Sequence, residues 1–500
     1  MTANTENTTM SDNVQPDRNR WIALYVLCAG VLMIVLDVTV VNVALPTIQD
    51  DLGFSQSSLA WVVNAYLISF GGLLLLSGRF GDLIGRKTIF MAGLVLFVAA
   101  SLLCGAAQSQ GMLVAARFVQ GIGGAMTSAV VLGMIVTMFP EPREQAKAIG
   151  VYGFVASAGG TIGLLAGGIL TEAISWHWIF FINVPIGVAT GVLAWRLIER
   201  DQGIGLREGA DVPGALLVTA SLMLGVYTIV QPAAEDGWGA TTTLLLGALS
   251  TLLLIAFIAR EATARTPLIP LRIFRSRNLS IANIVQPLLV AGMFGLFFMG
   301  ALYMERVLGY EPLQIGFAFL PATLVMGTLS LRYAEALITR FGARTTLLPG
   351  LVLIAIGLAL FTRTPVDGDY VQHILPSMLV MAMGIGVSFP ALMTLAMSGA
   401  SMEDAGLASG LVNTSAQVGG ALGLAVLATL STTRTDNLLA EGESNASALV
   451  SGYHLAFWIG TALVVASFLV AVFGLRREDA QAIAQPETEQ MRGEPQSEAA

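Results

Sequence analysis

The stretch from Trp21 to Leu45, WIALYVLCAGVLMIVLDVTVVNVAL, decides the fold class. It exceeds the roughly 20 residues that an α-helix needs to cross the hydrocarbon core of a bilayer, and Asp37 is its only charged residue. The stretch is too long for the apolar core of a cleavable signal peptide, and no small-residue cleavage site follows it. We therefore expect a helix that stays in the protein as its first membrane span.

Similar apolar runs recur along the whole chain of 500 residues. Hydrophobic residues make up 55% and charged residues 12%, about half the charged share of a soluble protein. A soluble fold could not cover its surface with so few charges. The sequence therefore predicts an all-α integral membrane protein with fourteen transmembrane helices. The predicted spans cover residues 21–45, 57–77, 88–107, 112–138, 146–170, 178–198, 211–231, 241–259, 280–304, 313–333, 345–361, 371–397, 404–430 and 453–475.

The basic residues support this number of spans independently. If the N-terminus is cytoplasmic, twenty-one of the 25 Lys and Arg residues fall in cytoplasmic segments or at the span ends beside them, three fall in outer segments, and Arg117 alone lies well within a span. Cytoplasmic loops carry such an excess of Lys and Arg, and one span more or fewer would invert every later loop. We expect a multi-pass protein of the cytoplasmic (inner) membrane with both termini in the cytoplasm.

The segments between the spans predict two six-helix bundles with an inserted hairpin. A weak repeat supports this plan, because an acid and a Gly-Arg pattern follow the second span at 78–87 and the tenth span at 335–344. Such repeats are common in secondary transporters, whose substrate site lies between the halves. The predicted boundaries are 1–20 for a disordered cytoplasmic tail, 21–200 for the first bundle, 201–279 for the two-helix hairpin and a cytoplasmic linker, 280–477 for the second bundle, and 478–500 for a second disordered tail.

Asp37 and Arg117 are the charged residues that the sequence places inside spans. Asp37 lies nine residues before Pro46, or ~13 Å of helix, and Arg117 lies six residues after Gly111, or ~9 Å. Both therefore enter from the outer side to a similar depth, and we expect them to pair. A carboxylate inside a span predicts a functional site, here one that carries protons. The alternatives are an acid that simply reaches water at the outer interface, and a static ion pair.

Two glycine patterns stand out. The first is the predicted loop Gly78-Arg-Phe-Gly-Asp82-Leu-Ile-Gly85-Arg86-Lys87, in which the glycines permit a tight turn and Asp82 lies just before a helix start, where acids are favoured. The second is in the fifth span, where the four-residue spacing of Gly159, Gly163 and Gly167, with Gly168 beside them, predicts close helix packing on one face. Packing alone would be enough to explain the second pattern.

Together these features resemble the major facilitator superfamily, and within it the fourteen-helix drug:proton antiporter branch. The resemblance runs from about Trp21 to Arg477. It rests on the Asp37 segment and on the motifs at 78–87, 113–123, 159–170, 176–185 and 410–414. It implies proton coupling for Asp37 and Arg117, conformational switching for Gly78, Asp82, Gly85, Arg86 and Lys87, and a helix-packing antiporter motif at Gly159, Gly163, Gly167 and Gly168.

Three positions depart from the pattern of that branch. Leu164 stands where the antiporter motif usually has Pro, which leaves open whether transport runs outward or inward. His177 stands where Arg is common. Glu305 stands where Gln is more usual, and it is either an acid at the outer interface or a second acid that faces cationic substrates.

The resulting functional hypothesis is a proton-coupled exporter of amphipathic drugs or antibiotics, which works by alternating access. The proton gradient would supply the energy, and we expect no cofactor, no metal, no nucleic acid and a monomer in the bilayer. Candidates for the substrate cavity are Asn42, Asn64, Tyr66, Gln120, Phe154, Met293, Phe297, Glu305 and Met383.

Two other functions remain as alternatives to a multidrug exporter. A dedicated exporter of one metabolite, antibiotic or lipid would keep the same fold. A membrane enzyme acting on lipids would need catalytic carboxylates or histidines gathered at one interface, and the sequence shows no such cluster. We therefore expect a protein that is not an enzyme.

Overall fold

The computed structural model describes residues 17–475, apart from 140, 200, 202, 204, 206–208, 231 and 398–404. The predicted tail 478–500 and residues 1–16 of the predicted N-terminal tail lie outside these described residues. The first helix begins at Asp17, so the last four residues of the predicted N-terminal tail are helical instead of disordered.

The described chain is built from helices of membrane-spanning length. Before the hairpin come α1 (Asp17–Leu52), α2 (Gln56–Ile84), α3 (Arg86–Gly105), α4 (Gln110–Met138), α5 (Pro142–Ala173), α6 (Trp178–Phe181) and α7 (Asn183–Leu197). The hairpin consists of α8 (Val212–Val230), α9 (Pro232–Glu235) and α10 (Thr241–Thr263). After it come η2 (Leu271–Arg275), α11 (Arg277–Arg306), α12 (Pro312–Thr328), η3 (Leu329–Tyr333), α13 (Ala334–Phe341), α14 (Ala343–Phe361), η4 (Tyr370–Ile374), α15 (Leu375–Met397), α16 (Ala405–Ala440) and α17 (Asn445–Gly474).

The crossings agree with the predicted spans. Among the described residues, 13 helical segments are long and apolar enough to cross a membrane. Helix α5 is 32 residues long and supplies the fourteenth, its described apolar part being Ile162–Ala173. The predicted all-α integral membrane fold is confirmed. Because the number of crossings is even, the first and last described residues lie at one end of the bundle, which we call the terminal end; the opposite end is the distal end.

Helix α1 is longer than its predicted span. It continues through Pro46 and ends at Leu52, although proline removes a backbone donor and usually ends or kinks a helix. The carbonyl of Pro46 is occupied by Arg306 Nη2 of α11 at 3.2 Å. The extra turns carry Gln49 and Asp50 toward α11, so they bring polar residues of the first bundle to the distal end.

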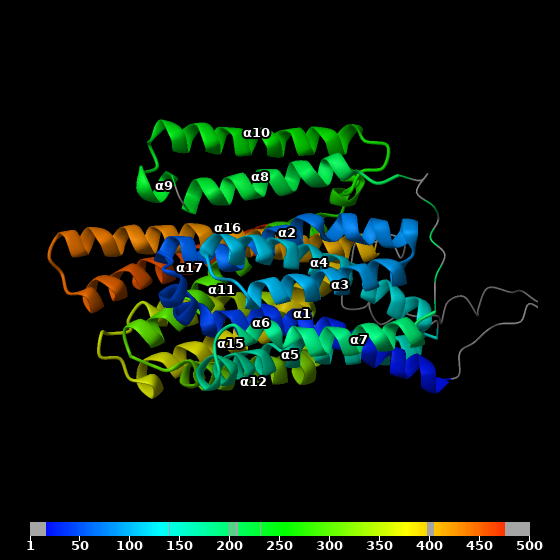
Figure 1. The fold of residues 1–500 in the computed structure, drawn as a ribbon, viewed down its shortest axis with the longest axis horizontal. Helices are drawn as coiled ribbons and strands as arrows, with labels where there is room; N and C mark the ends of the chain where they lie inside the picture. The colour runs from blue at the N-terminus through cyan, green and yellow to red at the C-terminus, as the bar shows by residue number, and fades with distance from the viewer. Residues whose placement is uncertain are drawn as a thin grey trace, which may run out of the picture.

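The hairpin forms a separate layer beside the bundles. Figure 1 shows α8 and α10 at one edge of the molecule, with α8 lying over α2 and α16 and α10 outermost. Helix α8 packs on α2 where Thr219 fills the space beside Gly72, and it meets α16 where Thr429 Oγ1 donates to the carbonyl of Ile229 at 3.1 Å. Helix α10 packs on α8 and leaves most of its side chains exposed, as a helix facing lipid does.

Helices that precede the hairpin in the sequence pack against helices that follow it along two seams. In one seam α2 packs against α16, and in the other α5 packs against α12, on the side of the molecule opposite the hairpin (Figure 1). Helix α1 lies against α5 and also reaches α11 and α12. Most residues singled out by the sequence in the first bundle lie on α1, α2, α4 and α5, so these seams position the candidate site.

Candidate transport site

Asp37 and Arg117 form a buried ion pair between α1 and α4. Arg117 Nη1 lies 2.5 Å from Asp37 Oδ2, and the two side chains are 1% and 0% exposed. The predicted contact is confirmed. Because α1 continues past Pro46, Asp37 lies fifteen residues before its end at Leu52, or ~22 Å of helix, whereas the segment up to Pro46 spans ~13 Å.

Three further polar side chains complete the surroundings of the Asp37 carboxylate. Its Oδ1 accepts from Gln120 Nε2 at 2.7 Å and from Asn183 Nδ2 at 2.9 Å. Gln120 Nε2 also donates to Ser101 Oγ at 2.8 Å. An ionised carboxylate only accepts hydrogen bonds, so the three donors Arg117, Gln120 and Asn183 suit the charged form of Asp37. Asn183, on α7, and Ser101, on α3, were missed as site residues, although Asn183 falls in a stretch that carried the family resemblance.

Arg117 is held from several directions. Its Nε donates to the carbonyl of Val62 on α2 at 2.9 Å, and Nη1 also donates to Gln120 Oε1 at 2.7 Å. The guanidinium carbon lies 4.4 Å from the ring centroid of Tyr66 and 5.7 Å from that of Phe180, which suits a cation–π contact. A buried charge pair with these extra bonds is costly to break, and removing one partner leaves the other charge uncompensated.

The predicted loop from Gly78 to Lys87 is instead a break of one residue. Helix α2 continues to Ile84 and α3 begins at Arg86, so only Gly85 leaves helical geometry, at φ +111. Asp82 therefore lies in the last turn of α2 and not before a helix start. It pairs with Arg86 four residues later, at 3.2 Å. The prediction failed because the apolar run ended near residue 77, whereas the helix extends into the polar segment.

Arg86 and Lys87 bind elsewhere in the first bundle. Arg86 Nη1 donates to the carbonyl of Gly133 and to Thr137 Oγ1 on α4, both at 2.9 Å. Lys87 Nζ donates to the carbonyls of Trp195, at 2.9 Å, and Ile198, at 2.5 Å, at the end of α7. These bases thus connect the ends of α4 and α7 to the α2–α3 corner.

The glycines of α5 allow two close approaches. Gly159, Gly163 and Gly167 face α1, and a Cβ at Gly167 would lie 2.8 Å from the carbonyl oxygen of Val40. Gly168 faces α12 instead, where a Cβ would lie 2.8 Å from the Cα of Leu313. The predicted close packing is confirmed. Three of the glycines pack against α1 in the same bundle, and Gly168 packs against α12 in the other bundle.

Comparison with known proteins assigns the family. The sequence profile described as "Major Facilitator Superfamily" matches residues 27–424. The chain belongs to the major facilitator superfamily. This facilitator is 40% identical over 473 residues to the puromycin resistance protein of Streptomyces alboniger, with 93% of each chain covered. It is 37% identical over 453 residues to the cephamycin export protein of Amycolatopsis lactamdurans, with 90% of each covered.

A solved structure shares the fold of this facilitator. The inward-facing, unoccupied form of a bacterial homologue of the human lysosomal transporter Spinster matches with a TM-score of 0.65 at 17% identity, and the match covers 92% of this chain and 98% of that one. The chain is therefore a multi-pass membrane transporter of this superfamily.

The residues predicted to line the substrate cavity of the facilitator lie in different surroundings. Asn64, Tyr66 and Gln120 are fully buried, so water does not reach them in this conformation. Asn42 and Met293 are almost as deeply buried, while Met383 is 36% exposed. Phe297 stacks on Phe319, with ring centroids 5.7 Å apart. Glu305 is partly buried, and the side chain of Phe154 lies outside the described residues. Their role in substrate binding stays a prediction.

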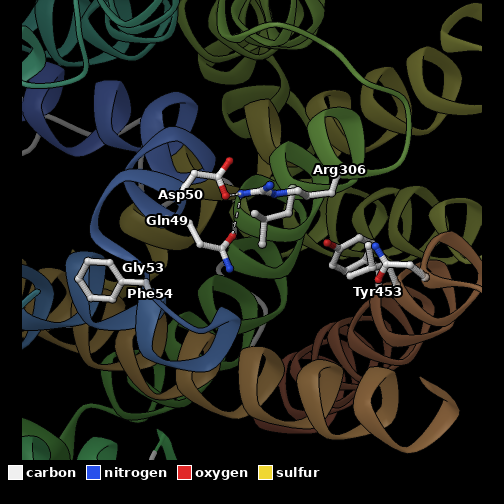
Figure 2. A pocket seen from close by; sticks show the side chains of 9 residues that line it. Gln49, Asp50, Gly53, Phe54, Arg306 and Tyr453 are labelled. Carbon is white, nitrogen blue, oxygen red and sulfur yellow. Dashed lines mark hydrogen bonds and ion pairs between the residues drawn. The ribbon is translucent and has the colours of Figure 1, made fainter. Parts of the chain in front are cut away.

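The distal end is closed by contacts between the bundles. Arg306 Nη2 of α11 lies 2.6 Å from Asp50 Oδ1 of α1, and Leu313 N of α12 donates to Glu172 Oε2 of α5 at 3.2 Å. Figure 2 shows Arg306 reaching across to Asp50 and Gln49, with Tyr453 on the far side of the arginine. Beside this ion pair lies a cavity of about 400 Å³, lined by Gln49, Asp50, Gly53, Phe54, Leu302, Arg306, Asn445, Leu449 and Tyr453.

Proposed function

We propose that this facilitator exports amphipathic antibiotics or related drugs across the cytoplasmic membrane in exchange for protons. The observation that carries the proposal is the buried Asp37–Arg117 pair in the first bundle of a chain 40% identical to a protein named for puromycin resistance. A carboxylate placed inside a span without a purpose would only destabilise the fold, and such residues mark proton and substrate pathways.

The hydrogen bonds suggest how a proton would act. In the conformation described, Asp37 accepts from Arg117, Gln120 and Asn183, and all three are donors. A proton on Oδ2 would replace the contact with Arg117, because a protonated oxygen and a guanidinium are both donors. Arg117 would keep its bonds to Val62 and Gln120. Protonation would thereby loosen α1 from α4 and favour a different arrangement of the two bundles.

The positions of the basic residues support one orientation in the membrane. By the positive-inside rule, the terminal end with both termini would lie in the cytoplasm and the distal end outside. The closed contacts of Arg306 with Asp50 and of Leu313 with Glu172 would then bar the outer side. Export requires these contacts to open while the bundles rock about a site between them. The proton gradient supplies the energy, and a single chain provides both bundles.

A dedicated exporter of one antibiotic is the second candidate. It is favoured by the names of the relatives, which refer to single antibiotics such as puromycin and cephamycin. Efflux of chemically unrelated dyes by the same protein would exclude strict dedication.

The test is dye transport in inside-out vesicles under an imposed pH gradient. Wild type should accumulate dye when the vesicle interior is acidic. Asp37→Asn should stop gradient-driven accumulation while the protein still folds, with a lower melting temperature than wild type, and still binds dye. Asp436→Asn, which changes an exposed acid on α16, is the matched control and should transport normally. Normal transport by Asp37→Asn would show that Asp37 is not the proton carrier. Dye movement in the opposite direction would show uptake.

A further inference from the structure

A buried pair of acids lies in the hairpin, at the terminal end and away from the Asp37–Arg117 ion pair. Asp211 immediately precedes α8, and Glu261 lies in the last turn of α10. Their exposed fractions are 2% and 4%. Acids of the hairpin did not enter the sequence-based list of site residues, because both fall at the predicted ends of spans, where charged residues are ordinary.

Each carboxylate is satisfied on one oxygen only. Asp211 Oδ1 accepts from the backbone N–H of Gly214 at 3.1 Å and from Arg260 Nε at 2.9 Å. Glu261 Oε2 accepts from the backbone N–H of Ile269 at 2.8 Å. The other oxygens, Asp211 Oδ2 and Glu261 Oε1, are buried and make no hydrogen bond in the described structure. Buried oxygens without a donor are rare, so each of these needs an explanation.

Both unpartnered oxygens lie beside Gly214. A Cβ added at Gly214 would collide with Asp211 Oδ2 and would lie 3.1 Å from Glu261 Oε1. Ionised carboxylates can only accept hydrogen bonds, so two of them beside the same glycine repel. The pair is stable only if something placed between these oxygens donates to both or neutralises one.

Arg260 is the base that pairs with one of the two acids, and an apolar wall lies beside them. Arg260 forms an ion pair with Asp211, whereas Glu261 is bound by a neutral backbone group. Arg79 of α2 donates to the carbonyl of Gly209 at 3.1 Å, and Arg265 in the following linker is exposed. The nearby cluster of Leu76, Ala215, Phe257 and Leu268 joins the hairpin to α2. Two ionised acids and one paired arginine would leave a net negative charge beside these side chains, which is costly.

We propose that Asp211 and Glu261 share one proton and thereby form a proton-binding site in the hairpin, distinct from the Asp37 pair. The proton makes one carboxyl a donor to the other, so it satisfies both remaining oxygens at once and brings the charge of Asp211, Glu261 and Arg260 to zero. A metal ion would need more ligands, and among the described residues no group of three His, Cys, Asp or Glu side chains is placed to hold one. This site goes beyond the export function and does not depend on it.

The shared proton has a structural consequence. Asp211 directly precedes α8, Glu261 lies in the last turn of α10, and Ile269 belongs to the linker that leads to α11. The proton therefore joins these three segments next to α2. Since the folded protein holds a proton that the unfolded chain would release, the stability of the protein falls as the pH rises through the range in which this proton is lost.

Glu261→Gln is the informative variant. The glutamine carbonyl can still accept from Ile269 N, and its NH₂ group can donate to Asp211 Oδ2, which reproduces the shared proton permanently. In purified full-length protein, an infrared difference spectrum of wild type minus Glu261→Gln at about pH 7 should show one protonated-carboxyl C=O band. The fall in melting temperature between about pH 6 and about pH 8 should be smaller in the variant than in wild type.

Controls keep this test decisive. Asp436→Asn changes an exposed acid and should leave both the band and the pH dependence of melting as in wild type. Asp211→Asn should also remove the band, but it breaks the ion pair with Arg260 and so should melt below Glu261→Gln. A wild-type spectrum that contains no carboxyl band lost in Glu261→Gln, or an unchanged pH dependence of melting in that variant, would overturn the proposal.

Discussion

The carboxylate of Asp201 caps the start of α3 by accepting the backbone N–H of Arg86 at 2.6 Å. Its other oxygen accepts the N–H of Lys87 at 3.0 Å. The first N–H groups of a helix have no partner inside the helix, so a carboxylate at this position satisfies them and favours the helix dipole. The acid that acts at this helix start is therefore Asp201, from the segment after α7, and not Asp82.

Replacing Asp201 by Ala should weaken the α2–α3 corner. Loss of an N-terminal cap costs about 0.5–2 kcal/mol, so we expect a lower melting temperature and slower export from Asp201→Ala. Thermal unfolding in detergent and dye efflux measure the two effects. Glu199→Ala changes an exposed acid two residues earlier and serves as control. Equal behaviour of the two variants would contradict the capping role.

Removing Arg117 should destabilise the protein more than neutralising Asp37 does. Arg117→Ala leaves the buried Asp37 carboxylate without its counter-charge, which costs roughly 3–5 kcal/mol. The double variant Asp37→Asn with Arg117→Ala should be more stable than Arg117→Ala alone, because no uncompensated charge remains. Melting temperatures of the two single variants and the double variant give the coupling. Strictly additive effects would argue against a coupled pair.

The close contact between α1 and α5 should not tolerate a methyl group at Gly167. A Cβ there meets the backbone of Val40, which cannot move aside as a side chain could, and such overpacking costs about 1–3 kcal/mol. Gly160→Ala is the matched control, since nothing lies within 4 Å of its added Cβ. That variant should be neutral or more stable by about 0.5–1 kcal/mol, because alanine favours the helix. Similar melting temperatures for the two variants would refute this packing.

We expect the ion pair between Asp50 and Arg306 at the distal end to open during each transport cycle. Cysteines at both positions, in a chain whose buried Cys28 and Cys104 are replaced by Ser, can be joined by a short bis-methanethiosulfonate crosslinker that spans the length of the arginine side chain. We expect crosslinking to stop dye export and a reducing agent to restore it. Each single-cysteine variant should keep exporting after the same treatment. Export by the fully crosslinked protein would show that this contact stays closed during transport.

Much of the fold could be predicted because the bilayer limits what an apolar sequence can do. Runs such as 88–107 and 178–198 match α3 and the α6–α7 crossing within two residues. The predicted ends of the helices were less accurate where a helix continues from an apolar run into polar sequence. Helix α1 runs past Pro46 and α2 past Ser77, because neighbouring helices supply packing and partners that hydropathy does not register.

The candidate site was only partly visible in the sequence. Asp37 and Arg117 could be paired because each is a lone charge in an apolar span. Asn183, Ser101 and Asp201 are ordinary polar residues, and only tertiary packing brings them to Asp37 and to Arg86. The hairpin acids were missed for the same reason, since their burial depends on the linker at Ile269 folding back over them.

The position of α8 bears on the geometry of any rocking movement. It touches both α2 and α16, while the seam of α5 and α12 lies on the far side of the molecule (Figure 1). Points near an axis of rotation move little, and displacement grows in proportion to distance from that axis. A helix attached to both bundles is strained least if the axis runs beside it. We therefore expect smaller movements beside α8 than at Gly168 and Leu313, which lie on the far seam.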